Sequence, residues 1–503
     1  MASVPFQLME ATIDSIHAAI RSGEMTCKQL VEMYLARIEA YDKNGPAINS
    51  IITINSNVVK EAQEMDEHFQ LTGEFAGALH GIPILVKDQA ETKGITTTFG
   101  SVAFKDYVPE EDATAIKKLR EAGAIILGKT TLPDFATSWF AFSSAAGETK
   151  NPYDLSRDPG GSSSGTAAAI AANLGAVGIG EDTGGSIRLP ASFTNLFGVR
   201  VTTGLISRTG MSPLVHFQDT PGPMTRSVRD AAILLDVLVG YDPADSFTAA
   251  AYQGGNAGNY AKQLTADGLQ GARIGILREA FGSDSHTESA QVNQVVQQAI
   301  EKMEAAGAHI IDPISVPQLT DYIGASAMYL LQSKHDFNEF LASKPGGKTV
   351  EELYNSQQYH ELLDLFKDIA GGPDHPEQDP EYYKGMLAQE QFRRAIVNVM
   401  ASHQLDAILF PTVQLLPPTK SELYEEKWTV LSFPTNTLIA SQTGLPSISM
   451  PAGFTEKGIP VGVEMISKQF NETTLLKLAH AYEIAAQPRR VPASTPTLEE
   501  ISK

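Results

Sequence analysis

Two short stretches rich in glycine and serine decide how this chain folds: Gly160-Gly161-Ser162-Ser163-Ser164-Gly165 and Asp182-Thr183-Gly184-Gly185-Ser186-Ile187-Arg188. The first leads into an alanine-rich helix pattern over residues 166–174, and the second follows a strand-like run at 176–180. Glycine lets the backbone approach a ligand closely, so either stretch alone is an ordinary turn or an anion cradle. The two together, each beside a strand–helix junction, favour a functional site.

A lysine stands upstream of both stretches, at the end of an apolar run. Lys87 directly follows Ile82-Pro83-Ile84-Leu85-Val86, which is a candidate for a buried strand. A serine hydroxyl is a poor nucleophile without a base, and a desolvated lysine can serve as that base once its pKa is lowered. Consecutive N–H groups of residues 183–186 could form an oxyanion hole beside the nucleophile. These residue types indicate covalent catalysis by a serine.

The rest of the sequence alternates strand and helix patterns and predicts an α/β fold, with helices covering a mostly buried sheet. The first 70 residues are expected to be helical, with a capping box at Thr26-Cys27-Lys28-Gln29. We expect Asp112 to cap a helix that runs to Ala122, and Gly128 to end the strand that follows it. Further strands are predicted at residues 273–277, 310–311, 406–410, 447–450 and 461–466, and further helices at 227–239 and 289–306.

The length alone would allow several domains, but the motifs favour one. At a typical domain size the 503 residues would divide into about three domains. The candidate site is spread from Lys87 to Ser186, however, and strand patterns continue to Ile466. Residues 317–404 are polar and rich in helix formers, and they predict a helical insertion or cap. We therefore expect a single domain over residues 1–503, with a core motif region at about 75–240.

The composition excludes several classes of protein. Hydrophobic residues make up 42% and charged residues 19%, which rules out a disordered chain and a coiled coil. The net charge is -21 without any basic run, so we expect no nucleic-acid partner. The one cysteine, Cys27, excludes a disulfide framework and a cysteine-based metal site. No apolar run approaches the roughly 18 residues that span a bilayer, and the N-terminal residues lack a signal-peptide pattern. We expect a cytoplasmic protein with no metal and no membrane contact.

Two motifs allow other interpretations. Residues 123–130 match the phosphate-loop pattern G-x-x-x-x-G-K-T, but the residues between the two glycines are themselves strand-like and a helix precedes them, which argues against ATP binding. Residues 161–165 match the nucleophile elbow G-x-S-x-G, centred on Ser163, although a loop precedes it where that motif needs a strand. Neither His80 nor His216 decides the matter. A Ser-His-acid esterase therefore stays open as an alternative.

These motifs together resemble the amidase signature family over nearly the whole chain. The central motif is highly specific. The spacing of Lys87, Ser162 and Ser186 also agrees with the family, and it selects Ser162 as the bridging serine. The matching segments are LHGIPILVKD (79–88), DATAIKKLREAGAIILGKT (112–130), KNPYDLSRDPGGSSSGTAAAIAANL (150–174), GEDTGGSIRLPAS (180–192), GLISRTG (204–210), QDTPGPMTRSVRDAA (218–232) and GLPSISMPAGFTEKGIPVGVEMI (444–466).

The resemblance implies a large mixed β-sheet covered by helices on both faces, and a Ser-cisSer-Lys catalytic triad. Ser186 would attack the carbonyl, and Ser162, held after a cis peptide bond with Gly161, would relay its proton. Lys87 would be the terminal base and would return the proton to the leaving amine. The resemblance also implies oxyanion or substrate binding by Thr183, Gly184, Gly185, Ser186 and Ala136, and supporting roles for Ser163, Asp182 and Arg188.

The implied function is hydrolysis of the C–N bond of a small-molecule amide, without a cofactor, by a monomer or homodimer. Aryl amides, carbamates and esters are further substrate classes. The first motif reads GGSSSG where many members have GGSSGG, and Gln89 stands where asparagine is usual. GGSSSG and QDTPGPM favour the stand-alone, peptide-amidase-like branch. The alternative within the family is the glutaminase-type subunit of a transfer-RNA amidotransferase.

Overall fold

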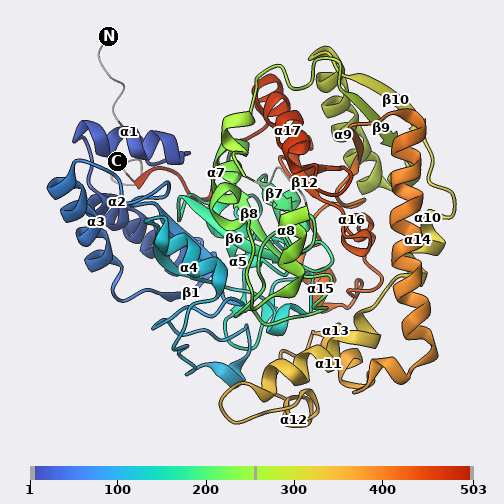
Figure 1. The fold of residues 1–503 in the computed structure, drawn as a ribbon, viewed down its shortest axis with the longest axis horizontal. Coiled ribbons are helices and arrows are strands. Elements are labelled where there is room, and N and C mark those ends of the chain that lie inside the picture. Colours follow the sequence, from blue (N-terminus) through green and yellow to red (C-terminus); the bar gives the residue numbers. More distant parts are fainter. Residues whose placement is uncertain (1–5, 254–257, 499–503) are drawn as a thin grey trace.

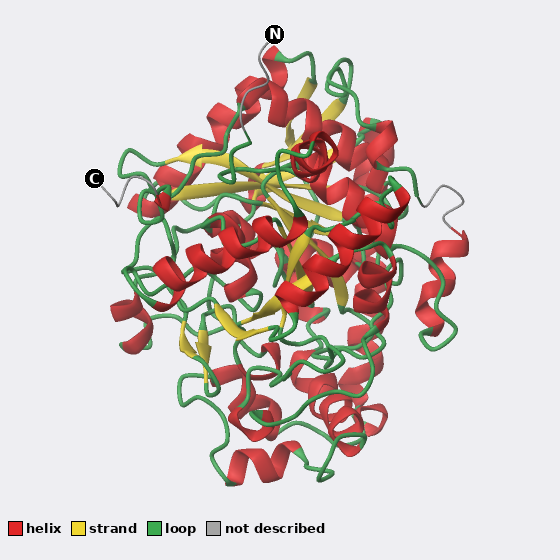
Figure 2. Cartoon of the chain, turned by 90° about the vertical axis from the view of Figure 1, so that its left-hand side faces the viewer, coloured by secondary structure: helices red, strands yellow, loops and turns green. Residues whose placement is uncertain are grey.

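The computed structural model describes residues 6–253 and 258–498. Within these residues eleven strands form one sheet, which lies in the interior of the molecule with helices around it (Figure 2). The strands of this sheet are β1 (Ile51–Ile54), β2 (Pro83–Lys87), β3 (Ile125–Thr130), β6 (Val177–Asp182), β7 (Phe197–Arg200), β8 (Thr220–Thr225), β9 (Arg273–Leu277), β10 (His309–Ile314), β11 (Ala407–Pro411), β12 (Ser447–Phe454) and β13 (Pro460–Ile466). A separate hairpin pairs β4 (Phe142–Ser143) with β5 (Gly147–Glu148).

The sheet is mixed, as expected, and its order is β1-β3-β2-β6-β8-β7-β12-β13-β11-β9-β10. Strand β2 runs parallel to both β3 and β6, and β9 runs parallel to both β10 and β11. The pairs between these two groups are antiparallel, as is the edge pair β1 and β3. Because β2 and β6 are parallel neighbours, their carboxyl ends, at Lys87 and Asp182, lie at the same edge of the sheet.

Helices cover both faces of the sheet. Figure 1 places α1, α2 and α3 on one side of the molecule, α14 along the opposite edge, and α11, α12 and α13 together at the lower end. The helices are α1 (Ile13–Ser22), α2 (Cys27–Arg37), α3 (Val58–Thr72), α4 (Thr114–Glu121), α5 (Ser164–Ala171), α6 (Arg188–Phe193), α7 (Val228–Leu238), α8 (Ala249–Gln253), α9 (Thr287–Ala305), α10 (Leu319–Ala325), α11 (Tyr329–Ala342), α12 (Val350–Asn355), α13 (Asp364–Ala370), α14 (Pro380–His403), α15 (Lys420–Tyr424), α16 (Leu438–Thr443) and α17 (Glu472–Ala486). Over the described part of the chain, none of these helices is both long and apolar enough to cross a bilayer.

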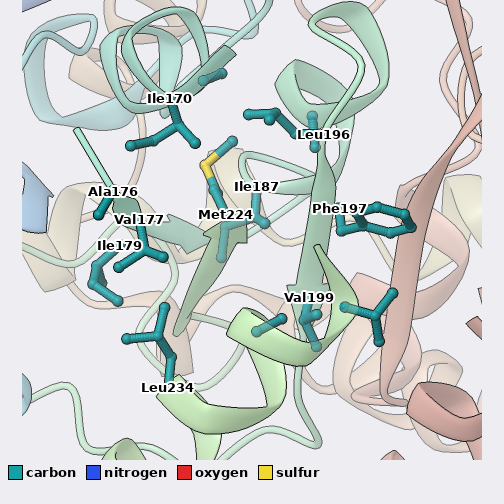
Figure 3. Close-up of a cluster of buried hydrophobic side chains, with 14 of the residues drawn as sticks. Ile170, Ala176, Val177, Ile179, Ile187, Leu196, Phe197, Val199, Met224 and Leu234 are labelled. Carbon is teal, nitrogen blue, oxygen red and sulfur yellow. The ribbon is translucent and has the colours of Figure 1, made fainter. Parts of the chain in front are cut away.

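A tightly packed apolar core joins strands β6, β7 and β8 to helices α5 and α7 (Figure 3). Ile179 of β6, Val199 of β7 and Met224 of β8 pack there with Ile170 of α5 and Leu234 of α7. Each of these side chains is at most 2% exposed. Protein interiors are packed as densely as organic crystals, so a core of this kind holds its elements in one arrangement. It therefore fixes both the strand that precedes Ser186 and the helix that follows Ser162.

Most of the predicted elements are confirmed, including the capping box at Thr26 and the helix that begins after Ser227. The expectation of only helices in the first 70 residues was wrong, because Ile51–Ile54 form the edge strand β1. Gly128 does not end its strand either, since β3 continues through it to Thr130. A β-carbon at Gly128 would lie 2.5 Å from the carbonyl oxygen of Thr53, so the glycine instead lets β1 approach closely.

Asp112 does not cap the helix that follows it. Helix α4 begins after Ala113, without a side-chain cap. The Asp112 carboxylate accepts the main-chain N–H of Lys93 at 2.8 Å and pairs with Arg120 at 3.2 Å. The carboxylate is thus held by a loop N–H and by a cation on the helix, and it ties the start of α4 to the preceding loop.

The stretch 317–404 is helical, as predicted, and consists of α10 to α14 with short connections. The phosphate-loop interpretation of residues 123–130 fails on structure, because Gly128, Lys129 and Thr130 all lie within β3. The Lys129 ammonium is buried against the Asp88 carboxylate at 3.1 Å, where it has no access to a nucleotide phosphate.

Candidate active site

Three segments meet at the carboxyl edge of β2 and β6. Lys87 is the last residue of β2, Ser162 lies in the loop just before α5, and Ser186 lies in the loop between β6 and α6. Ligands of open α/β sheets bind outside the carboxyl ends of the strands. The fold therefore brings the three predicted catalytic residues together where such a sheet places its sites.

Lys87 and Ser162 form a buried hydrogen-bonded pair. The Nζ atom of Lys87 lies 2.8 Å from Oγ of Ser162 and donates to the main-chain oxygen of Glu181 at 3.1 Å. Both side chains are fully buried, and the peptide bond between Gly161 and Ser162 is cis. Burial lowers the pKa of Lys87, because the charged ammonium loses its hydration, although nearby carboxylates oppose the shift. A lysine of this kind can lose its proton and act as a base.

Ser186 lies in a loop whose main-chain N–H groups are largely unused. The side chain is 2% exposed, and within the described residues it makes no hydrogen bond to Ser162. The N–H of Gly185 donates to the Asp182 carboxylate at 3.0 Å, so it is not free to bind an oxyanion. The N–H groups of Thr183, Gly184 and Ser186 have no acceptor among residues 6–253 and 258–498. Of the four main-chain N–H groups predicted to bind an oxyanion, these three therefore remain available.

Asp182 holds this loop through two arginines. Its carboxylate accepts hydrogen bonds from Arg188 at 3.0 and 3.1 Å and from Arg200 at 2.8 Å. Burial alone would raise the pKa of Asp182, but the two guanidinium groups outweigh burial and hold it well below its usual range. Arg188 also binds Glu464 of β13 and donates to Ser441 of α16 at 2.7 Å. The loop that carries Ser186 is therefore tied to both halves of the sheet.

Ser163 joins the two glycine- and serine-rich stretches. Its main-chain N–H donates to the carbonyl oxygen of Ser186 at 3.1 Å, and its hydroxyl donates to that of Glu181 at 3.2 Å. No hydrogen bond in the described residues links Ser163 to a histidine. Ser163 is thus held between two main-chain segments.

Ala136 lies in a buried turn, Asp134–Ala136, with φ of 62°. The chain then passes directly over Gly161, where a β-carbon would lie 2.9 Å from the carbonyl oxygen of Ser138. The structure therefore brings the segment that follows Ala136 against the Ser162 loop, and the substrate-binding role of Ala136 stays a prediction.

Several residues that the sequence motifs did not single out also contact the loop. Thr437 donates to the Gly184 carbonyl at 2.7 Å, and Gln218 donates to the Thr183 carbonyl at 2.7 Å. The Tyr329 hydroxyl lies so close to Gly184 that a β-carbon there would overlap it at 1.7 Å. Gln218 belongs to one of the matching segments and could have been noticed, whereas Thr437 and Tyr329 lie far along the chain and outside every motif.

Among the described residues, no group of three or more histidine, cysteine, aspartate or glutamate side chains is arranged to hold a metal ion. The groups that meet at the edge of β2 and β6 are a buried amine, two hydroxyls and a set of main-chain donors.

Comparison with known proteins agrees with this geometry. A family model described as Amidase matches residues 29–476. The chain belongs to the amidase signature family. Among members of the family, a glutamyl-tRNA(Gln) amidotransferase subunit from Syntrophus aciditrophicus (strain SB) is 34% identical over 496 residues, which is 95% of this chain and 97% of the relative.

Solved structures of amidase signature proteins show the same fold. A peptide amidase in complex with the competitive inhibitor chymostatin superposes with a TM-score of 0.86 at 33% identity, covering 97% of this chain and 100% of that one. A glutamyl-tRNA(Gln) amidotransferase subunit from Thermotoga maritima gives a TM-score of 0.76 at 26% identity, with coverage of 98% and 99%. The large mixed sheet with its helical layers is thus the fold of the amidase signature family.

Proposed function

We propose that this chain hydrolyses the C–N bond of small-molecule amides through an acyl-enzyme on Ser186. The observation that carries the proposal is the buried pair of Lys87 and Ser162, whose Nζ and Oγ atoms are 2.8 Å apart beside the Ser186 loop. A buried amine of lowered pKa next to a hydroxyl is the arrangement that activates a serine without a histidine.

The proposed steps use only these side chains and water. Neutral Lys87 takes the proton of Ser162 while Ser162 takes that of Ser186, whose Oγ attacks the carbonyl carbon. The N–H groups of Thr183, Gly184 and Ser186 hold the developing oxyanion. Lys87 returns the proton through Ser162 to the leaving nitrogen, and water then hydrolyses the ester on Ser186. Aryl amides, carbamates and esters present the same carbonyl to this machinery.

We also propose that the protein acts in the cytoplasm as a monomer or homodimer, without a nucleic-acid or membrane partner. We further propose one domain over residues 1–503, with a core motif region at about 75–240 and a helical insertion at about 317–404 that caps the site. The contact between Tyr329 of α11 and Gly184 supports a capping role for that segment.

A second candidate is the glutaminase-type subunit of a transfer-RNA amidotransferase. The relatives of 34% identity, which are named as components of such an enzyme, favour it. The likeness to peptide amidase structures, at TM-scores of 0.86 and 0.84, favours the first candidate instead. The two differ in what the purified chain does alone.

The deciding experiment is a hydrolysis screen of the purified full chain, without any partner, on aliphatic amides, anilides, peptide amides, carbamates and glutamine. Turnover of simple amides that disappears in Ser186→Ala supports the first candidate. Turnover of glutamine that appears only with an added amidotransferase partner would replace it with the second. A Ser-His-acid esterase would be indicated only if Ser163→Ala removed activity and Ser186→Ala kept it.

A further inference from the structure

The amine of Lys87 has three oxygen neighbours, and two of them belong to one residue. Ser162 Oγ lies at 2.8 Å, the main-chain oxygen of Glu181 at 3.1 Å, and Oε2 of Glu181 at 3.5 Å. A neutral amine has two hydrogens and one lone pair. For the lone pair to face the hydroxyl of Ser162, both hydrogens must be accepted elsewhere. The main-chain oxygen of Glu181 already accepts one hydrogen, and Oε2 of the same residue is the oxygen nearest to the other.

The Glu181 carboxyl is poorly placed to carry a negative charge. It is 1% exposed, and Oε2 accepts no hydrogen bond within the described residues. A buried carboxylate oxygen without a donor is costly. Oε1 accepts from the Thr183 hydroxyl at 3.2 Å, but that hydroxyl also donates to Asp219 at 2.6 Å, and the Gln89 side chain adds a hydrogen bond to the Glu181 carboxyl. The carboxyl therefore has few donors for an ionised group, and Oε2 has none.

The charges around Glu181 point the same way. Lys87 of β2 is the cation in contact with it, while Asp182 of β6 and Asp219, just before β8, add negative charge. Arg200 of β7 acts on Glu181 from further away and is hydrogen-bonded to Asp182, and the uncharged Tyr329 of α11 also interacts with the Glu181 carboxyl. Burial, and then the Asp219 carboxylate, raise the pKa of Glu181, and Lys87 opposes them only in part.

Resting on the proposed amide hydrolysis, we propose that Glu181 is a positioning residue that acts as an uncharged carboxylic acid. It accepts one hydrogen of the neutral Lys87 amine and so turns the lone pair of that amine toward Ser162. Lys87 and Glu181 together carry one acidic proton. When that proton moves to Glu181, an N–H bond of the Lys87 ammonium breaks and an O–H bond forms on the carboxyl. The net charge of the two residues stays zero. A permanently ionised Glu181 would do the opposite, because a carboxylate at this distance stabilises the ammonium and blocks the base.

The kinetic test uses two substitutions in the full chain. In Glu181→Ala the amine loses an acceptor, and we expect kcat to fall about 10²-fold through misorientation, with little change in KM. In Glu181→Gln the amide oxygen still accepts a hydrogen, so most of that loss is recovered. At low pH kcat/KM falls, and the pH at which this fall begins is called the acid limb. In Glu181→Gln the acid limb of kcat/KM should stay at the wild-type pH or move to a higher pH. If Glu181 were an ionised partner, that limb would move about 1–3 pH units lower, which would overturn the proposal. So would a wild-type kcat in Glu181→Ala.

A second measurement needs no substrate. Infrared difference spectra of the wild type minus Glu181→Gln at neutral pH should contain the carbonyl band of a protonated carboxylic acid. Its absence would overturn the proposal, and this holds even if Glu181→Ala fails to fold. If the wild type hydrolyses no amide, the proposed function fails, and the infrared band alone then decides the protonation of Glu181.

The matched control is Glu472→Gln. Glu472 is likewise buried, at 2% exposed, but its carboxylate binds the main-chain N–H of Thr202 and does not reach Lys87. The Glu472→Gln variant should therefore keep the wild-type kcat and the wild-type acid limb of kcat/KM.

Discussion

Two fully buried lysines lie on neighbouring strands of the same sheet, Lys87 on β2 and Lys129 on β3. Each lies near a carboxyl group, Lys87 with Glu181 at 3.5 Å and Lys129 with Asp88 at 3.1 Å. Burial lowers the pKa of both. By burial and pKa alone, either lysine could be taken for the general base.

The difference lies in the third partner. The Lys129 ammonium has three acceptors: Asp88, the Ala90 carbonyl at 2.7 Å and the hydroxyl of Thr97 at 2.7 Å, which gives its own hydrogen to the Ile95 carbonyl at 3.2 Å. Two ammonium hydrogens are donated to oxygens and the Asp88 carboxylate lies at ion-pair distance, which suits a charged, structural lysine. Lys87 instead faces Ser162, beside the Ser186 loop. The hydrogen-bond partners, more than burial, separate a base from a structural cation.

The largest expected effect comes from Lys87→Met. The variant keeps the apolar stem but has no amine, so we expect kcat to fall by about 10⁴-fold or more. Stability should change little, because Glu181 can remain an uncharged acid. Steady-state kinetics and denaturant unfolding of the purified variant measure the two quantities. Substantial activity in Lys87→Met would contradict the assignment of the base.

The equivalent change on the other lysine, Lys129→Met, should act on stability. It leaves the Asp88 carboxylate buried without its cation, and we expect the free energy of unfolding to fall by about 3–5 kcal/mol. The folded fraction should retain its kcat. A second substitution, Asp88→Asn, should restore part of the stability. If Lys129→Met abolishes turnover but has the same free energy of unfolding as the wild type, Lys129 is not a purely structural lysine.

A smaller effect is expected from Thr97→Val, which removes one acceptor from the Lys129 ammonium. A hydrogen bond to a charged group contributes about 1.5–3 kcal/mol, and the loss should appear in chemical denaturation with kcat unchanged. Ser162→Ala is the matching change at Lys87, and it should lower kcat while sparing the unfolding midpoint. An identical response of the two variants would mean that the two lysines do not differ in role.

The smallest effect is the pH dependence. The base must be uncharged, so kcat/KM rises with pH and levels off above the pKa of Lys87, falling about tenfold per pH unit below it. Because burial lowers that pKa, the limb should lie below the ordinary lysine value of about 10.4. Lys129→Met should leave the limb in place. If the acid limb moved in Lys129→Met, Lys129 and not Lys87 would be the group whose titration controls kcat/KM.

The sequence predicted Lys87, Ser162 and Ser186 because each lies in a short, specific motif at the end of a strand or the start of a helix. Glu181 stands inside the same motif and was passed over, since a charged residue next to Asp182 gives no sign of being buried. Thr437 and Tyr329 could not be found, because the packing that brings them to Gly184 joins segments without a shared pattern.

The fold was predicted best where strands are apolar and bounded by helices. Strand β8 was missed because Pro221 and Pro223 lie within it, and proline argues against a central strand. Strand β7 was missed because only four residues, including Gly198, form it. Strand β1 was missed because it also has only four residues and lies in a stretch that is otherwise helical.

The hydrogen bond between Arg188 and Glu464 has a consequence for how the molecule is made. All three proposed catalytic residues leave the ribosome early, but the arginine that fixes the Ser186 loop is itself anchored on β13, near the end of the chain. A nascent or prematurely terminated chain without β13 thus lacks one of the anchors of the Ser186 loop. We therefore expect fragments that end before β13 to be less active than the full chain, even where they contain Lys87, Ser162 and Ser186.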